Sequence, residues 1–265
     1  MRPVVAVVLL LFTTSVHANP DCNAAVITGI GRGIPADLTV EAAYFVQATY
    51  KAHKRSHGAV VIGYKAGLTS VASQARFEVP SPVSGVLYSD MVMPEETLQL
   101  CHFGQPMLEV ELGFILARSI KDEADVRLPL SALVSDVVPV IEIPDLSYAS
   151  RLTGPGIVAA NVAARGYLLG PPLATRNPAA INRVRVELMR DSQSLFKGVA
   201  TDAMGDQVKA LRWLLLHRLR QNDELVKGHL LITGALGQMV PAETGRYRAH
   251  FSIDETTWDL TFTVL

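Results

Sequence analysis

The sequence predicts an α+β fold, in which one mainly β domain follows a small helical N-terminal part. Three observations support this prediction. Apolar residues recur at helical spacing before residue 58, short β-like runs separated by Gly, Pro, Ser and Asp fill most of the remainder, and no Pro- or Ser-rich linker divides the chain. We therefore expect a signal peptide at residues 1–18, a helical part at 19–58 and a β-rich domain of catalytic type at 59–265.

The composition of the 265-residue chain excludes several classes of protein. Hydrophobic residues make up 49% and charged residues 18%, which is too apolar for disorder and enough to bury a large core. The 24 Lys and Arg residues nearly balance the 25 Asp and Glu residues, so no field attracts a phosphate backbone. We therefore expect a soluble protein with no nucleic-acid partner and, after signal cleavage, no membrane partner.

The first 18 residues have the plan of a secretory signal peptide. Arg2 precedes an apolar run at residues 4–12, and the pattern Val16-His17-Ala18 is typical of a cleavage site. The run is shorter than the roughly 20 residues of a membrane-spanning helix. We expect cleavage after Ala18 and a periplasmic or secreted protein. The alternative is a buried N-terminal strand.

The chain has two cysteines, Cys22 and Cys101. Export would place them in a compartment where disulfides persist, so one bridge between them is possible. Two buried or free thiols are the alternative. No Cys-x-x-Cys motif occurs, which excludes a zinc ribbon and a thioredoxin-type centre.

The helical part is predicted over Leu38 to about Ser56. Asp37 and Glu41 place negative charge at its start, and Gly58 after its basic end can adopt the left-handed cap conformation. From residue 59 onward the sequence consists mainly of short runs typical of β-strands. Strands are expected at 83–87, 107–116, 137–143, 184–188 and within 229–265, with one more amphipathic helix at 208–219.

Three glutamates stand in the apolar β runs. The period of two sends Glu109 and Glu111 to one face of a strand, and Glu142 is the only charge in the run 138–143. Neighbouring like charges are costly unless a cation or hydrogen-bond donors lie between them. One interpretation is a hard-oxygen site for Mg²⁺ or Mn²⁺. The other is an exposed antiparallel face with solvated glutamates.

A lone lysine, Lys65, stands in the glycine-flanked stretch 63–70. Glycines allow a ligand to approach the backbone closely. Partial desolvation would disfavour the charge of this lysine, a condition suited to proton transfer or to binding an anion. The alternative is an exposed strand lysine.

Six sequence blocks occur together between residues 38 and 251. They are Tyr44-x-Val46-Gln47, Gly63-Tyr64-Lys65-x-Gly67-Leu68-Thr69-Ser70, Gly85-Val86-Leu87-x-x-Asp90-Met91, Glu109-x-Glu111, Pro139-x-x-Glu142-x-x-Asp145 and Thr233-Gly234-Ala235-Leu236-Gly237-x-Met239-Val240. In combination and order they resemble the 2-keto-4-pentenoate hydratase branch of the fumarylacetoacetate hydrolase superfamily.

The resemblance implies a mixed, β-roll-like fold of the fumarylacetoacetate-hydrolase type, a homo-oligomer and a role in aromatic catabolism. It implies Mg²⁺ or Mn²⁺ and a small 2-keto acid substrate. It also assigns residues to roles: Glu109, Glu111 and Glu142 as metal ligands, Lys65 and Asp90 as catalytic groups, and Thr233, Gly234 and Leu68 as substrate-binding residues.

The function implied by the resemblance is that of a metal-dependent lyase, specifically a hydratase of an unsaturated 2-keto acid. A metal that binds both oxygens of the acid stabilises the charge formed when a proton leaves the neighbouring carbon. Ala160 stands where the hydratases usually carry Asp, which leaves two alternatives open. These are decarboxylation of a 2-keto-enedioate, and a non-catalytic exported protein that binds a carboxylate. Carbon–carbon hydrolysis would need a histidine-centred pair that the sequence does not reveal.

Overall fold

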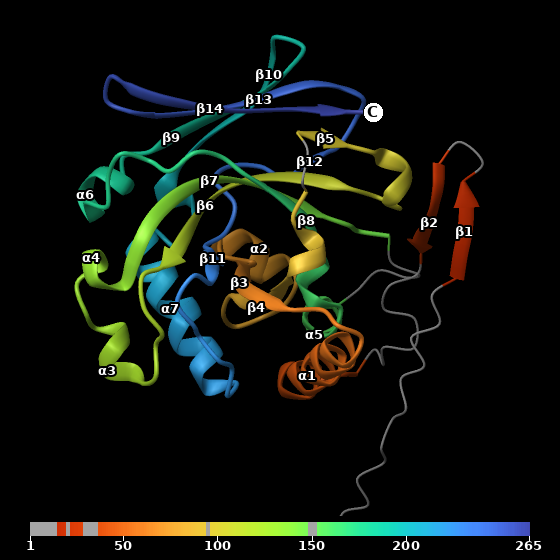
Figure 1. Ribbon diagram of the computed structural model, residues 1–265, viewed down its shortest axis with the longest axis horizontal. Coiled ribbons are helices and arrows are strands. Elements are labelled where there is room, and N and C mark those ends of the chain that lie inside the picture. The colour runs from red at the N-terminus through yellow and green to blue at the C-terminus, as the bar shows by residue number, and fades with distance from the viewer. Residues whose placement is uncertain (1–14, 20–21, 29–36, 94–95, 148–152) are drawn as a thin grey trace, which may run out of the picture.

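Two β-sheets form the body of the protein, and helices cover the side of the larger sheet away from the smaller one (Figure 1). The structure is a computed structural model that describes residues 15–19, 22–28, 37–93, 96–147 and 153–265. Residues 1–14 of the predicted signal peptide lie outside the described part. Among the described residues, no helix has the length and apolarity needed to cross a membrane.

A two-stranded antiparallel sheet precedes the main body. It consists of β1 (Ser15–Asn19) and β2 (Cys22–Thr28). The single-turn helix η2 (Leu100–His102) lies next to β2, and its Cys101 is disulfide-bonded. The sequence contains only one other cysteine, Cys22, whose side chain is outside the described part.

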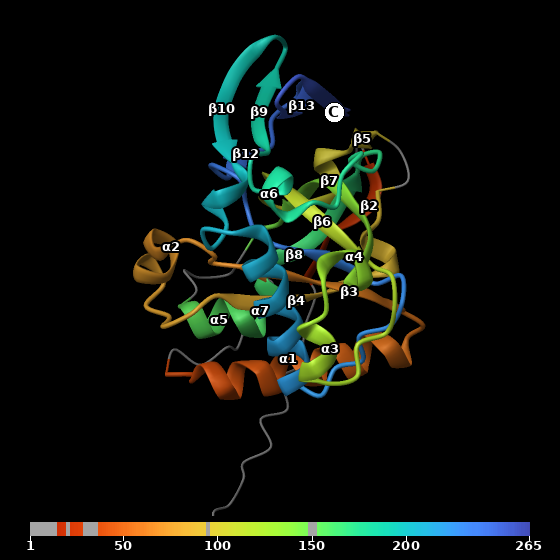
Figure 2. The ribbon, with the colours of Figure 1, turned by 90° about the vertical axis from the view of Figure 1, so that its left-hand side faces the viewer.

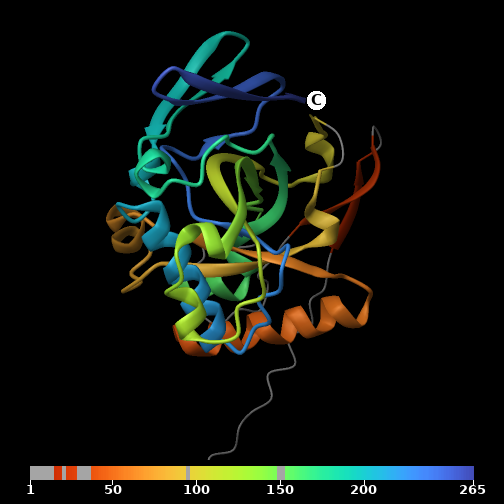
Figure 3. The same ribbon diagram turned by 60° about the vertical axis from the view of Figure 1, so that its left-hand side comes forward.

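The larger sheet has seven strands in the order β4-β3-β11-β6-β7-β8, with β12 paired to β6. β3 and β11 run parallel and the other pairs are antiparallel, so the sheet is mixed, as predicted. It curls around the centre of the molecule (Figure 3). The strands are β3 (Val61–Gly67), β4 (Val83–Tyr88), β6 (Met107–Leu116), β7 (Val134–Pro144), β8 (Ala164–Leu169), β11 (Leu230–Ile232) and β12 (Val240–Pro241).

The smaller sheet has five strands in the order β10-β9-β13-β14-β5 and lies at the top of Figure 1. Its strands alternate between buried and exposed side chains, because one face packs on the core and the other faces solvent. The strands are β5 (Thr97–Leu98), β9 (Arg185–Arg190), β10 (Gln193–Val199), β13 (Gly245–Ile253) and β14 (Thr256–Val264).

The two long helices, α1 and α7, lie at the end of the molecule opposite the smaller sheet in Figures 1 and 2. The Thr39 side chain caps α1 by accepting from Ala42 N at 3.2 Å, and the helix ends at Ser56 as predicted. The α-helices are α1 (Val40–Ser56), α2 (Val71–Arg76), α3 (Glu123–Val126), α4 (Leu130–Leu133), α5 (Gly154–Ala159), α6 (Pro178–Ile181) and α7 (Gln207–Arg220). Besides η2, the 3₁₀ turns are η1 (Ser89–Met91), η3 (Asn161–Ala163) and η4 (Ala200–Asp202).

A buried polar network joins α1 and α7 to the larger sheet. The Gln47 amide donates to the carbonyls of Ser84 and Val158 at 2.9 Å each. Arg218 donates to Gln47 Oε1 and to Ser84 Oγ at 3.0 Å, and it forms an ion pair with the buried Asp223. Buried polar groups are costly unless they are paired, so this network fixes how both helices pack.

The network predicts a large difference between two arginines of the last turn of α7. Arg218→Leu leaves the carboxylate of Asp223 buried with Lys51 as its only ion-pair partner in the described part, so the free energy of unfolding should fall by about 3 kcal/mol. Arg220→Leu removes an exposed ion pair with Glu123 and should cost less than about 1 kcal/mol. Urea denaturation of both variants under the same conditions measures this, and equal losses would contradict the role of the network.

Candidate metal centre

The strands β6 and β7 bring the three predicted glutamates together. In their antiparallel register, Glu109 stands directly opposite Glu142, and Glu111 lies two residues further along the same face. Each carboxylate offers an oxygen within 4.8 Å of the others. Glu111 is 1% and Glu142 0% exposed, so the alternative of solvated glutamates on an open sheet face is wrong.

Lys65, from β3, reaches the same cluster. It is 2% exposed, it forms an ion pair with Glu142, and it donates to Val162 O at 3.1 Å. The alternative of an exposed strand lysine is therefore also wrong. Burial opposes the charge of Lys65, but the attraction of the three glutamates is stronger and raises the pKa of Lys65 above its usual value.

The glutamates are poorly stabilised as anions by the protein alone. Burial raises the pKa of Glu109 to about 7, and it holds the pKa of Glu142 and, more strongly, that of Glu111 above the usual range. Apart from the ion pair with Lys65, neither oxygen of Glu142 has a hydrogen-bond partner among the described residues. Three carboxylates and one ammonium leave two negative charges, so the donor set fits a hard divalent cation such as Mg²⁺ or Mn²⁺.

The segment after β11 positions Glu111. Gly234 N donates to Glu111 Oε2 at 2.6 Å, and the backbone there has φ +110°, which favours glycine. A Cβ on Gly234 would lie 2.4 Å from Thr69 Oγ1. The buried Thr233 hydroxyl lies 2.6 Å from Gln207 Oε1. Thr233 and Gly234, from which substrate contacts were expected, thus make hydrogen bonds within the protein, and neither is among the residues that line the cavity described below.

A strained turn holds the acceptor for Lys65. All three residues of η3, Asn161, Val162 and Ala163, have positive φ, and this is unusual for a β-branched residue such as Val162. The Asn161 side chain offsets the strain by pairing with both backbone groups of Val86, at 2.7 and 2.9 Å. The turn directs Val162 O towards Lys65 Nζ, so it orients the ammonium group.

A cavity of about 410 Å³ opens beside the glutamates. Its charged side contains Glu109, Glu111 and Lys65, and the predicted substrate-binding residue Leu68 lines it. The other lining residues are mainly apolar or small, and they include Phe77, Ile157, Pro144, Leu146 and Met239. The site therefore combines an ionic end with an apolar wall, as small-molecule sites commonly do.

The structure does not bring Asp90 to this cavity. β4 ends at Tyr88, so Asp90 lies beyond the strand in η1, where its exposed carboxylate accepts from Lys54 Nζ at 2.5 Å. Conversely, Arg76 and Asp202 line the cavity, although no sequence pattern had singled them out. Arg76 ends the short helix α2 and Asp202 ends η4, and the placement of such short elements depends on tertiary packing.

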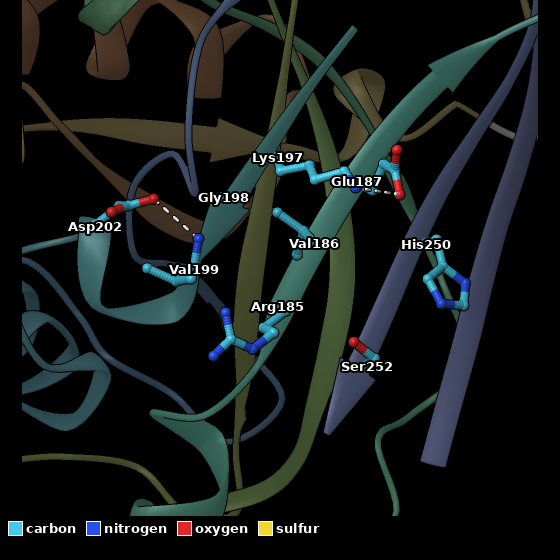
Figure 4. Close-up of a pocket in the computed structure, with 9 residues that line it drawn as sticks. All are labelled: Arg185, Val186, Glu187, Lys197, Gly198, Val199, Asp202, His250 and Ser252. Carbon is cyan, nitrogen blue, oxygen red and sulfur yellow. Dashed lines mark hydrogen bonds and ion pairs between the residues drawn. The ribbon is translucent and has the colours of Figure 1, made fainter. Parts of the chain in front are cut away.

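A second hollow, of about 440 Å³, lies on the smaller sheet (Figure 4). Strands β9, β10 and β13 contribute most of its residues, and Asp202 of η4 borders both hollows. Its charged groups are largely paired: Glu187 with Lys197 at 3.6 Å, and His250 with Asp259 at 2.7 Å. The groups drawn in Figure 4 therefore form no cluster comparable to the three glutamates.

The chain is similar to known proteins in sequence and in fold. No family model matches the sequence. The 2-keto-4-pentenoate hydratase of Paraburkholderia xenovorans is 31% identical over 211 residues, which are 79% of this chain and 78% of the relative. A 4-oxalocrotonate decarboxylase of a Pseudomonas species is 28% identical over 213 residues, covering 78% and 81%. The structure of 4-oxalocrotonate decarboxylase from Pseudomonas putida G7, complexed with magnesium and adipate, shares the fold with a TM-score of 0.79 at 19% identity, over 91% of both chains.

The glutamate cluster predicts that magnesium stabilises the protein more at about pH 8 than at about pH 6. A carboxyl group whose pKa is raised in the fold adds stability while protonated, and this contribution is lost as the pH rises through the folded pKa, about 7 for Glu109. A bound cation restores the loss by pairing with the ionised carboxylates. Thermal unfolding with Mg²⁺ or with EDTA at both pH values measures the effect.

Glu109→Gln provides the control for this measurement. It removes one oxygen ligand and one of the raised pKa values while keeping the size of the side chain. The variant should lose most of the magnesium-dependent shift. A shift of wild-type size in Glu109→Gln would show that the cation binds elsewhere.

Proposed function

The chain belongs to the fumarylacetoacetate hydrolase superfamily, in its 2-keto-4-pentenoate hydratase branch, and we propose that it is a metal-dependent lyase acting on a small unsaturated 2-keto acid. The observation that carries the proposal is the buried cluster of Glu109, Glu111, Glu142 and Lys65 beside a partly apolar cavity. Relatives named as a hydratase and as a decarboxylase of keto acids support the same reaction class.

The three glutamates would hold Mg²⁺ or Mn²⁺. When bound there, the cation would supply Lewis-acid stabilisation of negative charge developing on the carboxylate and keto oxygens of the substrate. Leu68 and the apolar wall would bind the carbon chain and exclude water from it. Gly234 would keep the carboxylate of Glu111 aimed at the cation through its N–H group.

Lys65 would transfer a proton to the substrate. Its raised pKa keeps it protonated, so it can donate to the substrate as a general acid and recover the proton afterwards. The ion pair with Glu142 and the hydrogen bond to Val162 O fix the position of Nζ at the edge of the cluster. Asp90 takes no part in this proposal, because it lies on the surface and is paired with Lys54.

Hydration is the first candidate reaction and decarboxylation the second. The sequence likeness to a named hydratase favours hydration. Hydration also needs a group that activates water, and Ala160 lacks the carboxylate that the hydratases usually carry there. Ala160 caps α5 directly before the strained turn η3. The absent carboxylate is the observation that keeps decarboxylation of a 2-keto-enedioate as the second candidate.

A turnover assay tests the proposal. The purified protein with Mg²⁺ or Mn²⁺ should consume a 2-hydroxydienoate or a 2-keto-enedioate, followed by ultraviolet absorbance, and the product mass separates addition of water from loss of carbon dioxide. Lys65→Met should lower turnover by about 100-fold or more. Lys54→Met removes a lysine that is paired with Asp90 outside the cavity and should leave turnover unchanged. No turnover across a panel of such acids would refute the proposal.

We also propose that the protein is exported. A segment with the plan of a signal peptide begins the sequence, and Cys101 is disulfide-bonded, which is typical of oxidising compartments. Expression in a bacterium should yield a periplasmic protein whose N-terminus is Asn19, measured by intact mass with and without a reducing agent. A full-length product in the cytoplasm would contradict export.

A further inference from the structure

Arg76 lies in the last turn of α2 and lines the same cavity as Glu109 and Glu111. We propose that it binds a second carboxylate of the substrate, so that the preferred substrate is a 2-keto dicarboxylate rather than a 2-keto monocarboxylate. This inference rests on the proposed function, because the keto-acid end of the substrate must first be placed at the glutamate cluster.

The first argument is the distribution of charge in the cavity. Among its lining residues, Lys65 and Arg76 are the two cations. Lys65 is already neutralised by Glu142. Arg76 forms no ion pair with any residue in the described part of the chain, so its charge is available to a ligand.

The second argument concerns how Arg76 is held. Its guanidinium carbon lies 5.4 Å from the centre of the Phe77 ring, and Phe77 also lines the cavity. Stacking on an aromatic ring positions the guanidinium without neutralising it. A planar guanidinium held in this way matches the two oxygens of a carboxylate.

The third argument is that the two cations reach one cavity from different elements. Lys65 stands on β3 in the glutamate cluster, whereas Arg76 stands on α2, which Ser70 caps by accepting from Ser73 N at 3.1 Å. A ligand with a carboxylate at each end can therefore be bound by the cluster and by Arg76 within the same cavity.

The cavity also offers apolar contacts to the carbon chain of such a ligand. Phe77, Ile157 and Met239 line the cavity and offer apolar contacts. The one other acidic lining residue, Asp202, accepts a hydrogen bond from Val199 N at 2.9 Å (Figure 4). Its carboxylate is not paired with Arg76 in the described structure, so Arg76 remains free for the substrate.

Two ligands of equal carbon number test the inference without turnover. 2-Ketoadipate and 2-ketohexanoate share the 2-keto acid end and differ in the distal carboxylate. Calorimetry with Mg²⁺ should show wild-type protein binding 2-ketoadipate about tenfold more tightly, as expected for one charge-assisted hydrogen-bonded pair. Arg76→Gln should bind both ligands with the affinity of wild-type protein for 2-ketohexanoate, and Arg76→Lys should recover part of the preference.

Arg220→Gln is the matched control, because Arg220 is also an exposed arginine in the last turn of a helix but lies outside the cavity. It should keep the full preference for 2-ketoadipate. Equal binding of both ligands by wild-type protein, or an undiminished preference in Arg76→Gln, would overturn the inference and leave the proposed function standing. If neither ligand binds in a magnesium-dependent way, the proposed function fails, and the inference fails with it.

Discussion

The burial of three carboxylates at one point of the curled sheet is the constraint on which the rest of the structure depends. Glu109, Glu111 and Glu142 repel one another, and burial removes the water that would screen them. A protein whose net stability is only several kcal/mol cannot leave such a cluster uncompensated. Two neighbouring elements supply part of the compensation, a positive charge from Lys65 of β3 and a donor from Gly234 in the segment after β11, and a bound cation would supply the rest.

The same constraint explains backbone conformations that are unfavourable in themselves. The left-handed conformation of Val162 costs free energy, yet it gives the buried ammonium of Lys65 an acceptor. Asn161 ties this turn to β4 by two hydrogen bonds, and Gly85 provides the room, because a Cβ there would lie 2.7 Å from Asn161 O. The positive φ of Gly234 likewise allows its N–H to reach Glu111. Part of the backbone strain in this fold therefore lies next to the charged cluster, as is common at functional sites.

Local patterns were enough to predict much of the fold and the centre of the site. Helical spacing located α1 to within two residues of its start, and the period of two placed Glu109 and Glu111 on one face of β6. The structure places Asp90 outside the cavity and pairs it with Lys54, a position that depends on where β4 ends and that no local pattern reveals. Gly234 contacts the site through its hydrogen bond to Glu111, whereas the Thr233 hydroxyl donates to Gln207. No local signal marks Arg76 or the network around Arg218, since both depend on which distant elements pack together.

The residues that line the cavity come from two kinds of structural element. The glutamate cluster lies on paired strands of the sheet, where register fixes side-chain positions and leaves little freedom for change. Other parts of the lining come from the short helix α2 and from segments such as η4, which can change composition without disturbing the core. Such segments can therefore alter what the cavity binds while the paired strands keep the glutamates in place. Arg76 and Ala160 both lie outside the paired strands, so the proposed substrate preference and the choice between the two candidate reactions depend on positions that the sheet does not constrain.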